Sequence, residues 1–99
     1  MKLIETIEQL SDGHPLSDIH IRVDQPIAIR VNGEIVRPSE QRVTNEESQS
    51  FLKECLSEEQ LEHLEEFRDA DLAIKIGKCR FRANFFYSST GVTAALRKI

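Results

Sequence analysis

Residues 79–87 alternate between two sets of side chains, and this alternation constrains the fold more than any other feature. One set is apolar or aromatic and consists of Cys79, Phe81, Ala83, Phe85 and Tyr87. The intervening set consists of Arg80, Arg82, Asn84 and Phe86. Successive side chains of a β-strand point to opposite faces. The segment therefore predicts a strand with one face in the core and the other carrying arginines.

Further alternating runs predict five more strands, grouped around two hairpins. They cover residues 19–23, 27–31, 34–37, 72–76 and 92–99. Asn32-Gly33 joins the second and third runs and is a strong hairpin signal, because a type I′ turn needs positive φ at both central residues. A second turn is expected at Gly77-Lys78, between residues 72–76 and 79–87.

Helical spacing of apolar residues predicts three helices. The first contains Leu3, Ile4, Ile7 and Leu10 and ends at Asp12-Gly13-His14-Pro15. Two capping boxes begin the others, one from Thr44 to Glu47 and one from Ser57 to Gln60. Their expected buried stripes are Phe51, Leu52, Cys55 and Leu56, and then Leu61, Leu64 and Phe67.

These elements follow the order α-β-β-β-α-α-β-β-β within 99 residues, a length that suits one domain over 1–99. We expect the α+β class, with an antiparallel-dominated sheet of about six strands and three helices packed on one face. Cys55 and Cys79 stand in apolar-periodic positions, which favours packed reduced thiols and a cytoplasmic location. No run approaches the roughly 18 apolar residues of a transmembrane segment.

Charge is divided unevenly along the chain. Residues 40–71 hold eleven acids against Arg42, Lys53 and Arg68, a net of −8. Residues 75–98 hold six cations and no acid, within a chain of net charge −4. A basic strip on the last strands suits an anionic partner such as phosphate, nucleic acid or an acidic protein.

The sequence gives little support to an active site within the chain. Gly77-Lys78 lacks the earlier glycine and the following Ser or Thr of a phosphate-binding loop. The three histidines and two cysteines lack metal-ligand spacing, and no local Ser, His and Asp arrangement indicates a nucleophile. Binding of single-stranded nucleic acid is disfavoured. Among the aromatic residues at 81–87, only Phe86 shares a face with the arginines, so no row of rings is available for bases to stack on.

Arg80, Arg82 and Asn84 are the candidate contact residues, since strand rise places successive members on one face about 7 Å apart. Guanidinium groups this close repel unless an anion or carboxylates lie between them, and arginine suits phosphate oxygens. The alternatives are ion pairs with acids of the helices, or solvation. Asp18 and His20 flank Ile19. Their structural interpretations are that Asp18 caps the preceding loop and that His20 forms a hydrogen bond across to the strand that carries Arg30.

Four segments resemble, in order and spacing, the N-terminal domain of the type II/type IV secretion ATPases, and especially the PilT-like retraction motors of type IV pili, which drive twitching motility. They are Ser17-Asp18-Ile19-His20-Ile21, Arg30-Val31-Asn32-Gly33-Glu34, Arg80-Phe81-Arg82-Ala83-Asn84-Phe85-Phe86 and Arg97-Lys98-Ile99. The resemblance covers nearly the whole chain. Asn32 stands where the family has Asp, which keeps the turn but removes a charge.

The resemblance implies a PAS-like domain that precedes a RecA-like ATPase domain in a hexamer. It implies that ATP and Mg are held by that downstream domain, with no cofactor, metal or catalytic residue in this chain itself. Carried onto this sequence, it makes Arg82 the first and Arg80 the second candidate for a nucleotide-phosphate contact. It assigns Asp18, His20, Arg30, Asn84 and Arg97 to the fold or to an interface.

The partners that the resemblance implies are the chain's own motor domain, the neighbouring subunit and inner-membrane pilus platform proteins, with no direct nucleic acid. Because Ile99 falls inside a strand-like pattern, we expect the chain to continue. The alternative function is a free-standing PAS-like module that binds a small molecule or an acidic protein. That alternative predicts a cavity between the sheet and the helices.

Overall fold

The structure is a computed structural model that describes residues 2–99. Its elements occur in the predicted order. They are α1 (Leu3–Gly13), β1 (Leu16–Arg22), β2 (Ala28–Val31), β3 (Glu34–Val36), α2 (Asn45–Cys55), α3 (Glu58–Phe67), β4 (Asp69–Ile76), β5 (Cys79–Ser88) and β6 (Gly91–Lys98). The α+β class is confirmed, with three helices and six strands among the described residues.

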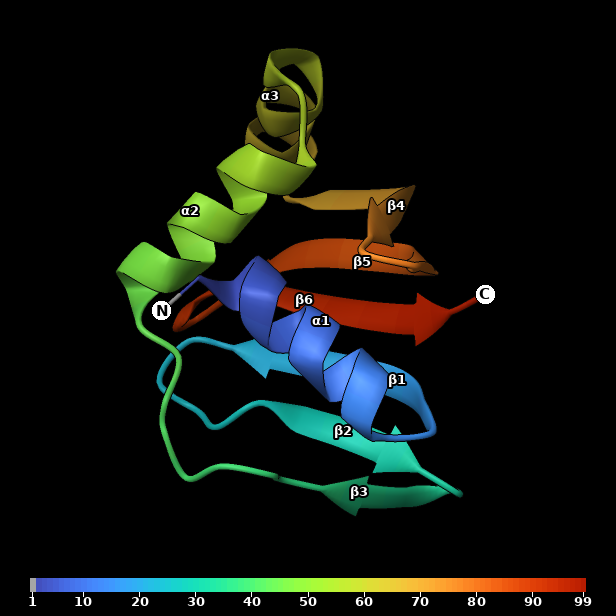
Figure 1. The fold of residues 1–99 in the computed structure, drawn as a ribbon. Helices are drawn as coiled ribbons and strands as arrows, with labels where there is room; N and C mark the ends of the chain where they lie inside the picture. Colours follow the sequence, from blue (N-terminus) through green and yellow to red (C-terminus); the bar gives the residue numbers. More distant parts are fainter. Residues whose placement is uncertain (1) are drawn as a thin grey trace.

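The six strands form one sheet in the order β3-β2-β1-β6-β5-β4, as Figure 1 shows. Every neighbouring pair of strands is antiparallel. The first three strands and the last three meet where β1 pairs with β6, so that Asp18 lies opposite Arg97. This long-range pairing brings the first and the last strand of the chain together at the centre of the sheet.

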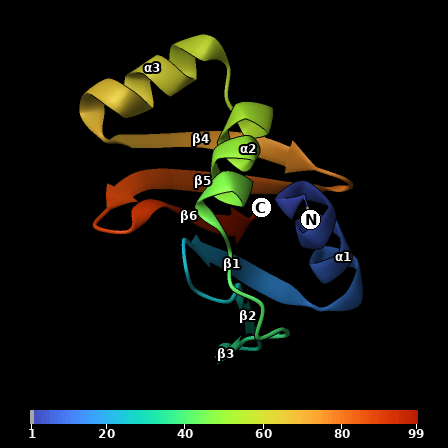
Figure 2. The same ribbon diagram turned by 90° about the vertical axis from the view of Figure 1, so that its left-hand side faces the viewer.

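Helices α1 and α2 lie across one face of the sheet, whereas α3 lies beyond the β4 edge (Figure 1 and Figure 2). Both predicted capping boxes form, with the side chains of Thr44 and Ser57 accepting from backbone N–H groups three residues on. The core fills the space between α1, α2 and the sheet. Its most buried members include Ile7, Ile19, Ile29, Phe81, Phe85 and Leu96.

The predicted hairpin turn at Asn32-Gly33 is confirmed, because φ is 50° at Asn32 and 81° at Gly33. The period-two face assignment of 79–87 is also confirmed. Phe81, Ala83 and Phe85 are fully buried, while Arg80 and Arg82 are exposed.

The prediction that Phe67 belongs to a buried stripe is wrong, since Phe67 is 61% exposed. Because α3 packs at the sheet edge, Leu64 is its one buried side chain. Arg68, the C-cap residue that follows α3, adopts the left-handed conformation with φ 62°, and the chain enters β4 directly at Asp69. The strand therefore begins three residues before the predicted Leu72.

Candidate functional site

The sheet face opposite α1 and α2, called here the open face, carries the polar side chains of the alternating strands. Directly opposed residues in antiparallel strands point to the same face. Arg82 lies opposite Arg97, and Arg97 lies opposite Asp18. Asp18 in turn lies opposite Arg30. We call Arg30, Asp18, Arg97 and Arg82 the arginine row, because they cross β2, β1, β6 and β5 side by side.

Asp18 is the anchor of the arginine row. Its Oδ1 lies 3.3 Å from Arg97 Nε, and its Oδ2 lies 3.7 Å from Arg30 Nε. The Ser17 hydroxyl donates a hydrogen bond to Oδ2 at 2.7 Å. Burial alone would raise the pKa of Asp18, but the Ser17 hydrogen bond and the two arginines outweigh it and lower this pKa. The carboxylate is therefore held in its charged form.

Arg82 forms an exposed ion pair with a residue that the sequence interpretation missed. Its Nε lies 3.4 Å from Asp71 Oδ1 on β4, its Nη2 donates to Asp71 Oδ2 at 3.4 Å, and the Arg82 side chain stays 73% exposed. The acids of the helices, expected as alternative partners, are not involved in this pair. Asp71 was recognisable only as a polar residue at the start of an alternating run, with no signal of its cross-sheet partner.

A surface hollow of about 260 Å³ lies next to the arginine row. Ala95 of β6 lies opposite His20 on one neighbouring strand and opposite Asn84 on the other. Because the alanine side chain is short and its neighbours are long, a space is left above it. The hollow is lined by Asp18, His20, Asp71, Arg82, Asn84, Ala95, Leu96 and Arg97. Five of the seven residues singled out in the sequence thus come together from three strands.

His20 and Asn84 differ in how they are held. Asn84 Nδ2 donates to Asp69 Oδ1 at 2.9 Å and to the Ala70 carbonyl at 3.4 Å, which fixes its amide against β4. His20 lies opposite Ala28 and Ala95, and its ring makes no hydrogen bond within residues 2–99. The cross-strand hydrogen bond considered for His20 is therefore not formed.

Arg80 shares the open face but not the hollow. It lies two residues before Arg82 on β5 and opposite Lys75 on β4, and its backbone carbonyl accepts a hydrogen bond from the Ile99 N–H at 2.9 Å. Its guanidinium has no ion-pair partner in the described part of the chain. Arg82 therefore has Arg97, rather than Arg80, as its cationic neighbour across the strands.

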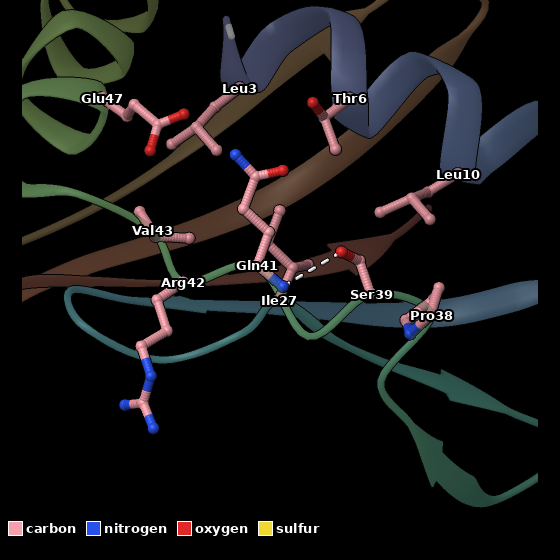
Figure 3. A pocket seen from close by; sticks show the side chains of 10 residues that line it. All are labelled: Leu3, Thr6, Leu10, Ile27, Pro38, Ser39, Gln41, Arg42, Val43 and Glu47. Carbon is pink, nitrogen blue, oxygen red and sulfur yellow. Dashed lines mark hydrogen bonds between the residues drawn. The ribbon is translucent and has the colours of Figure 1, made fainter.

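A separate apolar cavity lies between α1 and the segment that connects β3 to α2 (Figure 3). Leu3 and Leu10 of α1 face Ile27, Pro38 and Val43 across it. Its volume is about 60 Å³, far below the roughly 300 Å³ or more of small-molecule pockets. This cavity offers no support for a small-molecule sensor.

Residues 2–99 contain no cluster of three or more His, Cys, Asp or Glu side chains arranged to hold a metal ion. Cys55 and Cys79 are free and half-buried. None of the helices within the same range has the length and apolar character needed to cross a membrane.

No protein-family model matches the chain. It is 29% identical over 84 residues to the type IV pilus retraction ATPase PilT of Pseudomonas aeruginosa strain PAO1, a match that covers 84% of this chain. The chain spans only 24% of that protein.

Solved structures show the same likeness. A crystal structure of the pilus retraction motor PilT with bound ADP superposes with a TM-score of 0.83 and 34% identity, over 98% of this chain and 29% of that one. The DotB ATPases of Legionella pneumophila and Yersinia pseudotuberculosis superpose with TM-scores of 0.79 and 0.77 at 19% and 18% identity, which shows a shared fold. They cover 98% of this chain and 28% and 29% of theirs.

The fold is thus that of the N-terminal region of the pilus and secretion ATPases. More particularly, the chain is homologous to PilT, in agreement with the resemblance drawn from its four motifs.

Proposed function

We propose that this chain is the N-terminal assembly and regulatory domain of a hexameric motor ATPase of the pilus or secretion type. In this proposal Arg82 contacts the phosphates of ATP held by a RecA-like motor domain of the same protein. The same proposal includes that the domain is PAS-like and that the protein is cytoplasmic. Its partners are the motor domain, the neighbouring subunit and inner-membrane platform proteins.

The observation that carries this proposal is the opposition of Arg82 and Arg97 on the open face. Like charges directly opposed on neighbouring strands destabilise a sheet, yet both side chains remain largely exposed, at 73% and 80%. The planar guanidinium fork binds phosphate oxygens through two parallel hydrogen bonds. Each arginine has one carboxylate partner, Asp71 for Arg82 and Asp18 for Arg97, and an anion in the hollow would be within reach of both arginines at once.

Homology to PilT, whose crystal structure contains ADP, supports a nucleotide as that anion. The chain lacks a phosphate-binding loop of its own, so the motor domain would hold the nucleotide and Mg²⁺. ATP offers a γ-phosphate that ADP lacks. A difference in arginine contact between the two nucleotides would favour different domain orientations, which is how hydrolysis would drive rigid-body motion.

The test is the Arg82→Ala change in a protein that carries this chain together with its motor domain. We expect ATP hydrolysis to fall by at least about tenfold, since an arginine positioned at a γ-phosphate is typically worth about 10³ or more. Arg80→Ala should have a smaller effect, because Arg80 lies outside the hollow.

Arg22→Ala is the matched control, since Arg22 is an exposed arginine on the same face, opposite Thr93. Its hydrolysis rate should stay close to wild type. Retention of hydrolysis by Arg82→Ala to within about twofold of wild type would remove the proposed role, given the size of a typical arginine contribution.

A further inference from the structure

Asp18 has two arginine partners, and only one of them lines the hollow. Arg97 lines it together with Arg82. Arg30 lies on β2, on the far side of Asp18 from Arg97, and is 44% exposed. The two guanidiniums contact different oxygens of the carboxylate, Oδ1 for Arg97 and Oδ2 for Arg30. Either arginine can therefore leave without displacing the other.

The burial of Asp18 makes a second partner important. Its side chain is only 12% exposed, and a largely buried carboxylate that loses its sole ionic partner is strongly destabilised. With Arg30 and the Ser17 hydroxyl still in contact, Asp18 stays neutralised when Arg97 moves. Arg97 is 80% exposed, so its guanidinium has room to move.

We propose that Asp18 and Arg30 are a positioning pair for Arg97, and that they adjust how readily Arg97 moves to an anion beside Arg82. Asp18 holds Arg97 in the arginine row while the hollow is empty. Arg30 shares the Asp18 carboxylate and so weakens its hold on Arg97. The inference rests on the proposed function, in which the hollow receives the phosphates of a nucleotide.

One consequence separates this arrangement from simple charge attraction. The anion and Asp18 compete for Arg97, so Arg30 affects anion affinity through Asp18 and not by touching the anion. Removal of Arg30 leaves Arg97 as the only arginine on Asp18, which tightens that ion pair. The effect of removing Arg30 should therefore vanish once Asp18 has lost its charge.

The experiment is a titration of this chain with inorganic tripolyphosphate over the millimolar range, followed through the Nε–Hε NMR signals of Arg82 and Arg97. The signals of both arginines should shift together in the wild type. Arg30→Gln should weaken binding about threefold, the scale of a partly exposed ion pair. Asp18→Asn should strengthen binding, because it releases Arg97.

The decisive comparison is Arg30→Gln made in the Asp18→Asn background. There it should weaken binding no more than Arg22→Gln does, since only general attraction for the anion is lost. An equal effect of Arg30→Gln with and without the Asp18 charge overturns the positioning role alone. If the Arg82 signal does not respond to tripolyphosphate at all, the proposed phosphate contact is overturned as well.

A measurement without anion covers the case in which Asp18→Asn disturbs folding. In Arg30→Gln, the Nε–Hε group of Arg97 should be more ordered in ¹⁵N relaxation than in the wild type, because Asp18 then binds Arg97 alone. Unchanged or greater mobility of Arg97 in this variant contradicts the inference.

Discussion

The side chain of Glu8 on α1 lies directly over Gly77 in the turn between β4 and β5. A Cβ atom on Gly77 would come within 2.6 Å of Glu8 Cγ, and Gly77 has a φ of 60°. Glycine at this position therefore meets two requirements, a left-handed backbone and a close approach by the helix above it. The two can be separated experimentally.

Gly77→Ala should lower the free energy of unfolding by about 1–2 kcal/mol, the usual cost of the left-handed conformation for a residue with a Cβ. Glu8 is an exposed helix residue whose side chain can swing aside. The loss should therefore change by less than about 0.5 kcal/mol in a Glu8→Ala background, the range of an ordinary surface change. Urea denaturation measures both values.

Two other glycines are matched controls. Gly33→Ala meets the same backbone strain, with φ 81° and nothing within 4 Å, and should cost as much as Gly77→Ala. Gly13 has neither positive φ nor a close neighbour, so Gly13→Ala should be neutral or stabilise by up to about 1 kcal/mol. Equal losses at all three positions would contradict this account.

Phe67→Ala should change the free energy of unfolding by less than about 0.5 kcal/mol, as expected for a surface substitution. Phe51 is the comparison, since it is 2% exposed and its ring packs near that of Phe85. Phe51→Ala should cost about 3–5 kcal/mol through loss of buried contacts and creation of a cavity. A large loss for Phe67→Ala would contradict the exposure of this ring on α3.

The stabilising contribution of Asp18 should depend on pH. Since its pKa is lowered in the folded state, folding is favoured by the charged form, fully so above the unfolded-state pKa of about 4. As the pH falls through the folded pKa, that contribution is lost. The stability difference between wild type and Asp18→Asn should therefore be larger at neutral pH than in acid, as measured by denaturation at several pH values.

Asp12→Asn provides the reference, because Asp12 is an exposed carboxyl on α1. Its difference from wild type should not show the same loss of stability in acid. A wild-type advantage over Asp18→Asn that persists unchanged in acid would mean that Asp18 acts through packing and not through its charge.

Cys55 should resist alkylation in the folded protein. Burial, and then the neighbouring Glu54 carboxylate, raise the pKa of its thiol to about 12. At pH 8 almost no thiolate is present, and the thiolate is the reactive form. Iodoacetamide labelling followed by mass spectrometry should show slow modification of Cys55 in the folded chain and rapid modification in denaturant. Equal rates in the two conditions would contradict the burial of this thiol.

Much of the fold was predictable from local patterns. The alternation at 79–87 assigned Phe81 and Phe85 to the core and Arg82 to the exposed face, because the strand period does not depend on distant contacts. The capping boxes at Thr44 and Ser57 correctly began two helices for the same local reason. The prediction that Phe67 is buried was wrong because helical spacing identifies an apolar stripe but not how far the helix overlaps the sheet.

For the candidate site, the sequence predicted which residues take part but not how they are arranged. Arg82, Asp18, Asn84 and Arg97 were singled out from motif spacing, but their relationships were not. Asp71 carried no signal as a partner for Arg82, since the register of β4 against β5 pairs Asp71 with Asn84 and leaves Arg82 diagonally across from it. Arg80, equal to Arg82 in the sequence pattern, lies outside the hollow.

The sequence by itself determined the order of the strands and helices and the alternation of buried and exposed side chains along β5, since propensity, capping and periodicity act between near neighbours. Only the tertiary structure decided that Asp18 and Arg97, 79 residues apart, would share an ion pair beside Arg82. That contact depends on the pairing of β1 with β6, and the register of such a pair is set by packing of the whole core against α1 and α2.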